Sequence, residues 1–507
     1  MKKTYLISYF LITLFKINAQ NISLTPNTVT VPRLNYEAIL ALTNPTEGQI
    51  VYDLTFHCLR IYNGNKWLCS FQNPSEPNPM TLLVSSGGTN FDSGQKVVVD
   101  ASGNIYVTGY YSGTATFGTT IKVSVGQNDI FVAKYNNVGI LQWVQSAGGT
   151  SDDRGYGIAI DATGNVYITG SFFGNTTFGS NTINSTGGHD IFILKYNSDG
   201  IMQWVQSAGG ASSDYSYGIA SDGSGNVYIT GYYTGSATFS TTILTSNQGI
   251  LDPEIFLAKY NSSGVLQWVQ SAGGNGTQIS NGVALDGSGN IYITGSLNIS
   301  GNFGSNNISV IGYQDIFVAK YNNFGNIQWV KSMGGSSSSA SGDGIAVDGN
   351  GNVFVTGVFT ATTYFGDMSK TSTGDLDAFV FKCNSLGNIQ WVQSMGGIGH
   401  ERSYGIGTDS FGDVCITGYF ENTINLGTTT ITSVGNTDIF VIKYNSFGSF
   451  QWGQTAGGVS GDQGNGITVD TVGNIYITGY YMGTATFGVS NRSSAGGSDI
   501  FVAKIAK

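Results

Sequence analysis

One segment of about 61 residues recurs along most of this chain, and this repeat limits the folds that are open to it. A tryptophan marks six copies, at positions 143, 204, 268, 329, 391 and 452. A Thr-Gly pair marks seven copies, with its glycine at positions 109, 170, 231, 295, 357, 418 and 479. An acid before Ile-Phe or Ala-Phe marks the same seven: Asp129, Asp190, Glu254, Asp315, Asp377, Asp438 and Asp499. The period predicts seven copies of one supersecondary unit between residues 81 and 507, each covered by its neighbours.

Each copy contains two hairpin signals. In residues 157–170 two apolar stretches flank a turn that Asp161 opens and Gly164 closes. In residues 191–210 Asn197 and Gly200 take the same places. A short hairpin loop needs Asn or Asp at its start and glycine at its left-handed position. One copy is therefore predicted to be a four-stranded antiparallel meander.

Composition agrees with an all-β fold and excludes several functions. Glycine accounts for 74 of 507 residues, and only 10% of residues are charged, against about 25% in ordinary domains. Strong helix formers are therefore scarce. The net charge of −10 and the absence of a basic stripe exclude a nucleic-acid partner.

The apolar strands and the two ends of the repeat together predict the architecture. Strands that are apolar on both faces need cover on both sides, as in the blades of a propeller. Residues 499–507 read as a third strand without a fourth, and residues 81–88 read as a fourth strand without a third. We therefore predict a seven-bladed β-propeller, in which strand 81–88 completes the last blade and removes the exposed sheet edges.

The repeated segments resemble a known family. The patterns D-x-x-G-N-x-Y-[IV]-T-G and D-[IA]-F-x-x-K-[YC]-N-x-x-G-x-x-Q-W-x-x-x-x-G-G recur across residues 81–507 and resemble the SBBP ("seven-bladed beta-propeller") repeat proteins of bacteria. The resemblance implies a secreted or surface propeller from a family without one uniform activity. The segment Asn18-Ala19-Gln20 is similar to the ends of export signals in Bacteroidetes proteins.

Residues 1–19 read as a signal peptide. Lys2 and Lys3 precede an apolar run over residues 5–15, and Ala19 is a small residue at the expected cut. The alternative, a membrane anchor, would need about 20 apolar residues. The expected location is secreted or at the cell surface, with the periplasm as a further possibility, and no transmembrane segment is expected.

Between the signal and the repeat, residues 20–72 are predicted to form a small β-hairpin module. Its tight turn is expected at Asn63-Gly64. Cys58 and Cys69 flank this hairpin, so a disulfide is plausible in an oxidising compartment. Residues 73–80 carry three prolines and read as a linker.

Several recurring side chains are predicted to be structural. The aspartate of D-x-x-G is expected to cap its turn, because a calcium loop would need further oxygen ligands. The acid before Ile-Phe is expected to accept backbone N–H bonds. The repeated lysines (134, 195, 259, 320, 382, 443 and 504) are expected to form internal ion pairs near the aspartate turns. Cys383 and Cys415 are predicted to be core residues. No metal or cofactor is expected.

The variable loops are the predicted binding site. The loops between the fourth strand and the next first strand lie on one face of such a ring, and binding residues concentrate on variable loops of rigid scaffolds. These loops are acidic, with tyrosines nearby. The predicted binding residues are Asp152, Asp153, Tyr156, Asp214, Tyr217, Asp343, Glu401, Tyr404 and Asp462. The alternative is a solvated acidic rim.

The predicted function is binding of a protein or glycan by a monomeric scaffold, without catalysis and without catalytic residues. The alternative is a carbohydrate-active or other hydrolytic propeller that uses carboxylates of the acidic face, which would need two carboxyls at a defined separation. Acids that converge on one pocket would favour the enzyme, and acids spread around the ring would favour the scaffold.

Overall fold

The computed structural model describes residues 23–25, 28–30, 32–34, 38–39, 41–46, 49–53, 58–62, 67–72, 77–246, 252–426 and 429–507. The chain divides into two compact units, residues 1–77 and residues 78–507. The predicted signal peptide lies outside the described residues. We call residues 78–507 the repeat domain.

The N-terminal unit is built from short strands. β1 (Ser23–Thr25) pairs with β2 (Thr28–Thr30), and a second sheet has the order β3 (Arg33–Leu34), β4 (Ile50–Asp53), β5 (Cys58–Tyr62), β6 (Trp67–Gln72). In the antiparallel β5–β6 pair Cys58 lies opposite Gln72, and Arg60 lies opposite Cys69. The side chains of both cysteines are outside the described residues, so the disulfide stays a prediction.

The repeat domain consists of antiparallel four-stranded meanders, which confirms the all-β prediction. We number the four strands of each sheet from first to fourth. The first strands are β8 (Ser93–Val99), β14 (Arg154–Ile160), β20 (Tyr215–Ser221), β26 (Gln278–Leu285), β32 (Ala340–Val347), β38 (Arg402–Thr408) and β42 (Gln463–Val469). The second strands are β9 (Ile105–Tyr111), β15 (Val166–Phe172), β21 (Val227–Thr234), β27 (Ile291–Leu297), β33 (Val353–Phe359), β39 (Val414–Asn425) and β43 (Ile475–Phe487).

The outer strands complete each sheet. The third strands are β12 (Asp129–Tyr135), β18 (Asp190–Tyr196), β24 (Pro253–Tyr260), β30 (Asp315–Tyr321), β36 (Asp377–Cys383), β40 (Thr430–Tyr444) and β44 (Ser490–Ile505). The fourth strands are β13 (Leu141–Gly149), β19 (Met202–Gly210), β25 (Leu266–Ala272), β31 (Ile327–Met333), β37 (Ile389–Met395) and β41 (Phe450–Gly458). The strand that pairs with β44 is β7 (Thr81–Gly88), with Ile500 opposite Ser86. The last sheet therefore takes its fourth strand from the other end of the domain.

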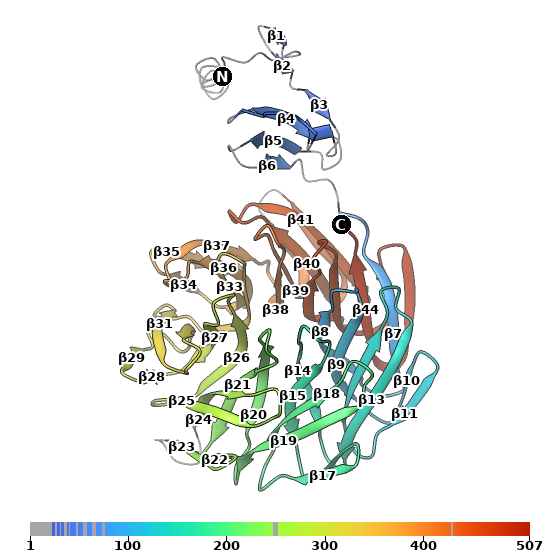
Figure 1. Ribbon diagram of the computed structural model, residues 1–507, viewed down its shortest axis with the longest axis vertical. Helices are drawn as coiled ribbons and strands as arrows, with labels where there is room; N and C mark the ends of the chain where they lie inside the picture. The colour runs from blue at the N-terminus through green and yellow to red at the C-terminus, as the bar shows by residue number, and fades with distance from the viewer. Residues whose placement is uncertain are drawn as a thin grey trace. The chain divides into compact units, whose positions relative to one another are not determined.

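Figure 1 shows these sheets side by side around a common centre, with their first strands nearest to it. The first strands contact one another in the cyclic order β8, β14, β20, β26, β32, β38, β42 and again β8. Apolar side chains fill the space between consecutive sheets. In one such layer Tyr106 of one sheet packs with Phe172 and Phe192 of the next.

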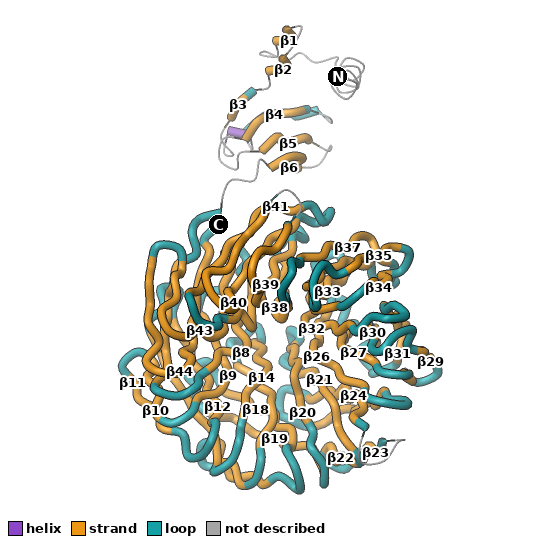
Figure 2. Tube along the Cα trace, turned by 180° about the vertical axis from the view of Figure 1, so that it is seen from behind, coloured by secondary structure: helices purple, strands orange, loops and turns teal. Residues whose placement is uncertain are grey.

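A further hairpin links each sheet to the one before it, and Figure 2 shows these hairpins at the outside of the domain. The separately named hairpin strands are β10 (Thr114–Phe117), β11 (Thr120–Val123), β16 (Asn175–Phe178), β17 (Asn181–Asn184), β22 (Ser236–Phe239), β23 (Thr242–Thr245), β28 (Ser300–Phe303), β29 (Asn306–Ser309), β34 (Thr362–Phe365) and β35 (Met368–Thr371). β16 pairs with β13, the fourth strand of the preceding sheet, and β10 pairs with β7 in the same way.

The Gly-Gly pair at the end of the fourth strand makes room for this link. A Cβ on Gly149 would overlap the carbonyl oxygen of Asn175 in the neighbouring hairpin. A Cβ on Gly148 would overlap the carboxyl group of Asp129. Gly149 therefore leaves space for the hairpin of the next sheet, and Gly148 leaves space for the carboxyl group of the recurring acid.

The predicted roles of both recurring acids are confirmed. In the first turn Asp100 accepts N–H bonds from Ser102 and Asn104 at 2.9 Å each, and Gly103 has a φ of 81°. On the third strand Asp129 accepts the N–H of Val125 at 3.1 Å. Both acids thus stabilise loops through backbone hydrogen bonds.

The prediction of ion pairs for the repeated lysines is wrong for most of them. The Lys134 ammonium donates to the carbonyl oxygen of Ser198, in the turn of the next sheet, at 3.0 Å and lies over the Tyr106 ring. Because the sheets stack in register, the ammonium reaches a backbone carbonyl in the turn of the next sheet instead of a carboxylate. Lys443 is different: it pairs with Asp409 at 2.9 Å and Asp413 at 3.1 Å.

The tryptophans and cysteines of the repeat are also structural residues. The Trp143 indole N–H also donates to the Ser198 carbonyl, at 3.1 Å, and its ring covers Gly200 of the next sheet. Trp143 is half-buried at this joint. Cys383 and Cys415 are free and buried, as predicted, and burial raises the pKa of both thiols to about 12.

Candidate ligand site

A β-bulge in each first strand turns one side chain out of the sheet. In β14 the pairing with β15 passes from Gly155 directly to Gly157, so Tyr156 is the extra residue. The same shift occurs in every first strand named above. The bulge residues are Gln95, Tyr156, Tyr217, Asn281, Asp343, Tyr404 and Asn465. A bulge re-aims a side chain, and bulges are common next to binding sites.

The bulge has a local cause in the sequence. The residue before the bulge is small in every copy, and the residue after it is glycine in six of seven. On the partner strand, a Cβ on Gly170 of the Thr-Gly pair would overlap the carbonyl oxygen of Arg154. The recurring Thr-Gly glycine therefore lets the bulged strand approach.

All the bulge residues line one cavity of about 440 Å³ at the centre of the repeat domain. Its other lining residues are Ser93, Lys96, Tyr110, Arg154, Arg402, Gln463 and Tyr480. A narrower space of about 210 Å³ shares Lys96, Tyr217, Asn281 and Asp343 with it and is otherwise lined mainly by apolar residues and glycine. We call the larger space the axial cavity.

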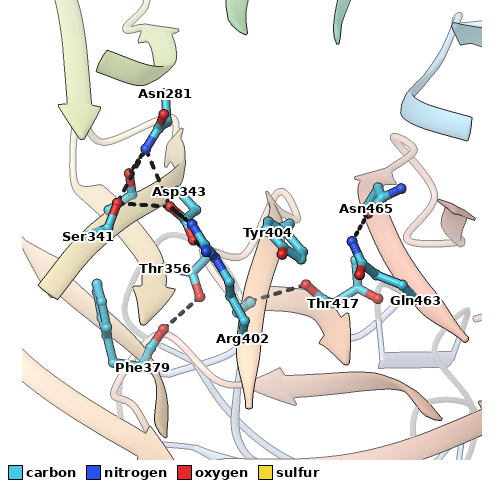
Figure 3. Close-up of polar contacts among 12 residues, drawn as sticks. Asn281, Ser341, Asp343, Thr356, Phe379, Arg402, Tyr404, Thr417, Gln463 and Asn465 are labelled. Atoms are coloured by element: carbon cyan, nitrogen blue, oxygen red, sulfur yellow. Dashed lines mark hydrogen bonds and ion pairs between the residues drawn. The ribbon is translucent and has the colours of Figure 1, made fainter. Parts of the chain in front are cut away.

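Asp343 is held by a network of donors, which Figure 3 shows. The Arg402 guanidinium donates to Oδ2 from Nε at 2.7 Å and to Oδ1 from Nη2 at 3.1 Å. Ser341 donates its hydroxyl at 3.0 Å, and the Asn281 amide donates at 3.3 Å. Arg402 also lies over the Tyr404 ring. The one carboxylate that lines the axial cavity is thus neutralised and fixed.

Aromatic rings form one side of the cavity and its rim. The Tyr156 and Tyr217 rings pack edge to face with their centroids 5.1 Å apart. Behind them, Tyr215 stacks on His189 and its hydroxyl lies 3.0 Å from His189 Nδ1. Burial lowers the pKa of His189. This side offers ring faces and phenolic hydroxyls to a ligand.

The predicted site residues fall into two groups. Tyr156, Tyr217, Asp343 and Tyr404 line the axial cavity. Asp152 does not line the cavity but pairs at 3.0 Å with Arg154, which does.

The other predicted acids are buried in loops. Asp153, Asp214, Glu401 and Asp462 are 0% exposed. Asp214 accepts the N–H groups of Gly210 and Thr234 at 2.8 and 2.9 Å, and both equivalent bonds recur at Asp153 and Asp462. Glu401 accepts the N–H of Gly397 at 2.9 Å. These carboxylates close the loops that the sequence marked as variable, and they do not face the cavity.

The sequence predicted an acidic face, whereas positive charges outnumber negative charges in the lining of the axial cavity. Its charged lining residues are three cations, Lys96, Arg154 and Arg402, and one carboxylate, Asp343. Sequence reasoning missed these cations and the amides of Gln95, Asn281, Gln463 and Asn465. A comparison of the copies could have found the bulge: one variable residue stands between small residues in an otherwise repetitive strand.

Two features are absent from the described residues. These residues contain no group of three or more His, Cys, Asp or Glu residues arranged to hold a metal ion. No helix among them is long and apolar enough to cross a membrane.

Two known proteins are similar to this chain in sequence. An uncharacterized WD repeat-containing protein of Acanthamoeba polyphaga mimivirus is 25% identical over 497 residues, which covers 78% of this chain and 35% of that protein. The regulatory protein FlaEY of Caulobacter vibrioides is 28% identical over 147 residues, which covers 27% of this chain and 15% of that protein. This chain therefore matches about a third or less of the length of these relatives.

A solved structure is similar to this chain in fold, and a family model matches parts of its sequence. A gluconolactonase from Xanthomonas campestris is similar over 85% of this chain and 99% of that chain, with 10% identity and a TM-score of 0.32. The SBBP family, described as beta-propeller repeat, matches residues 142–171, 203–236, 267–303, 328–358 and 451–480. Five stretches of the chain thus match the SBBP beta-propeller repeat.

Proposed function

We propose that this chain is a secreted or cell-surface, seven-bladed β-propeller that binds a saccharide in its axial cavity and does not transform it. The cyclic contacts of the first strands and the pairing of β7 with β44 support a closed ring. The observation that carries the function is the ring of bulge residues, because it collects one variable side chain from each copy at one cavity.

The chemistry of the lining favours a saccharide. Tyrosine rings such as Tyr156 and Tyr217 present apolar faces on which the C–H face of a sugar can rest, and phenolic hydroxyls can hydrogen-bond to sugar hydroxyls. The amides of Gln95, Asn281 and Asn465 both donate and accept, as sugar hydroxyls do. The volume of about 440 Å³ is within the range of small-molecule sites.

The carboxylates support binding without catalysis. A glycoside hydrolase needs two carboxyl groups that face the scissile bond, one of them as an acid. Asp343 is the one carboxylate that lines the axial cavity among the described residues, and Arg402 already occupies both of its oxygens. The hydrolytic alternative would need a second carboxylate at the cavity.

The expected result of removing the aromatic side is a loss of affinity. Tyr156→Ala and Tyr217→Ala should each raise the Kd for the best ligand of a glycan array by at least about tenfold, or about 1.4 kcal/mol. Tyr313→Ala is the control, since Tyr313 is 71% exposed and does not line the cavity. Calorimetric titration of the purified chain measures the Kd.

Two outcomes would overturn this function. If no glycan is retained by the array, or if both tyrosine variants bind as tightly as the parent, the axial cavity is not a saccharide site. If the retained glycan is cleaved during incubation, as chromatography of the products would reveal, the non-catalytic part of the proposal fails.

A further inference from the structure

Lys96 breaks the repeat at the centre of the domain. The residue directly after the bulge is glycine in six copies: Gly157, Gly218, Gly282, Gly344, Gly405 and Gly466. These glycines lie where neighbouring first strands come close. A Cβ on Gly466 would lie 2.8 Å from Lys96 Cα, and a Cβ on Gly344 would lie 2.8 Å from the Tyr404 carbonyl oxygen. A lysine is therefore an exception at a position where neighbouring first strands lie close together.

The Lys96 side chain extends into the space that the glycines leave. It lines both the axial cavity and the narrower space next to it. Its ammonium donates to the Tyr404 carbonyl oxygen at 3.4 Å, a long hydrogen bond. Within the part of the chain that the structure describes, no carboxylate lies within 4.0 Å of this ammonium, and Asp343 is bound to Arg402 instead. The ammonium thus has no carboxylate in contact with it, and the charge of Asp343 acts on it only from a greater distance.

The surrounding charge makes the cavity attractive to an anion. The charged lining residues have a net excess of two positive charges, although the whole chain has a net charge of −10. A cation inside a narrow, partly desolvated space interacts with an opposite charge more strongly than a surface cation does.

We propose that Lys96 receives the carboxylate of an acidic saccharide, so that the ligand of the axial cavity is a uronic-acid-type sugar. The inference rests on the proposed saccharide function and adds the charge of the ligand. The sugar ring would rest against the tyrosine side, and its carboxylate would lie at the base of the cavity, where the ammonium has no other anion in contact with it.

The pH dependence offers a second readout of the same contact. Burial lowers the pKa of Lys96 to about 8, and the charge of Asp343 acts in the opposite direction. Besides Lys96 and Asp343, the titratable or charged groups that line the axial cavity are Arg154, Arg402, Tyr110, Tyr156, Tyr217, Tyr404 and Tyr480. Burial raises the pKa of Tyr404 to about 12 and the pKa of Tyr217 further, and the pKa of Arg402 is raised as well. Affinity for an acidic sugar should therefore fall as the pH rises through about 8, because Lys96 loses its proton there.

The test is a titration of the full chain with oligomers of galacturonate, glucuronate and mannuronate, each compared with its neutral methyl ester. We expect at least one acid to bind at least about tenfold more tightly than its ester at pH 6.5. Lys96→Gly should abolish this preference and the pH dependence, and the six copies with glycine indicate that the variant can fold. Lys96→Met serves the same purpose if the glycine variant does not fold. Lys122→Met, on the outer hairpin strand β11, is the matched control for the loss of one charge.

The outcomes separate this inference from the proposed function. If acid and ester bind equally, or if Lys96→Gly keeps the preference, the role of Lys96 is wrong and saccharide binding stands. If none of the acids or esters binds while neutral glycans do, the acidic ligand class is wrong. If no saccharide of either kind binds, both proposals fail.

Discussion

The folded chain should be more stable at pH 5 than at pH 8, because its sheet joints contain pairs of buried carboxyl groups. At one joint Asp462 and Asp438 are 0% and 2% exposed and lie beside each other, and equivalent pairs recur at other joints. Burial, together with the charge of the neighbouring acid, raises the pKa of Asp92, Asp214, Asp462 and Glu401 to about 7, against the lowering effect of backbone hydrogen bonds. Burial also raises the pKa of the partner acids Asp129, Asp190 and Asp499 to about 6.

The sign of the effect follows from proton binding. A carboxyl whose pKa is higher in the folded chain than in the unfolded chain holds a proton that the unfolded chain has released between about pH 4 and pH 7. Its contribution to stability is complete below about pH 4 and is lost as the pH rises through 7. Each carboxyl with a pKa near 7 should contribute about 2–3 kcal/mol between pH 8 and pH 5, although coupling within a pair limits the sum. Urea unfolding at the two pH values measures it.

Asp438→Asn tests this explanation. Asp438 Oδ2 accepts the Val434 N–H at 3.0 Å, whereas Oδ1 is buried without a partner. An asparagine can keep the first bond and place its amide donor on the side of Oδ1, next to Asp462. We expect the free energy of unfolding at pH 8 to rise by about 2 kcal/mol and the pH dependence to shrink.

The control is Asp199→Asn, because Asp199 is an exposed turn residue, and it should leave the pH dependence unchanged. Two copies already lack the Asp462-type acid and have Gln278 and Ala340 in its place. A loss of stability of Asp438→Asn that is equal at both pH values would contradict the explanation.

Gly149→Ala should destabilise the repeat domain by roughly 3 kcal/mol, the upper range for overpacking. The new Cβ would overlap the Asn175 carbonyl oxygen, a backbone atom that cannot rotate away. The overlap can be relieved only by moving β16 away from β13, which breaks the link between two sheets. Equilibrium unfolding in urea measures the loss.

Gly223→Ala is the matched control, since nothing lies within 4 Å of a Cβ built on Gly223. That change should be neutral, or stabilising by a few tenths of a kcal/mol through the unfolded state. Equal stabilities of the two alanine variants would show that the hairpin link is not tightly packed against the Gly-Gly pair.

The sequence predicted those parts of the fold that depend on local chemistry. The turns at Asp100 and Asp161 could be read directly, because an Asx residue and a left-handed glycine are three residues apart. The fourth strand from residues 81–88 could be inferred because a meander of fixed period leaves an unpaired strand at each end. Periodicity therefore sufficed for the sheets.

The site was harder to predict because it depends on a β-bulge, which changes the face of the sheet to which the following residues point. Strict alternation assigns neighbouring residues to opposite faces, and a bulge shifts this assignment by one residue. Asp153 and Tyr156 both appeared to lie on a loop face, yet Asp153 turns inward to bind backbone N–H groups while Tyr156 reaches the cavity. Lys96 looked like an ordinary strand residue until its position could be aligned with six glycines.

The bulges separate what holds this protein together from what a ligand would meet. Turn acids, joint glycines and the aromatic layers between sheets are shared by nearly all copies, whereas each bulge contributes a single side chain that has no partner in the ladder. Substitutions at those few positions could change the chemistry of the central cavity without disturbing the sheets. If one copy is duplicated and its bulge residue is then substituted, the binding specificity can change while the sheets stay intact. The present set of tyrosines, amides and one aspartate is one of many combinations that the same framework could carry.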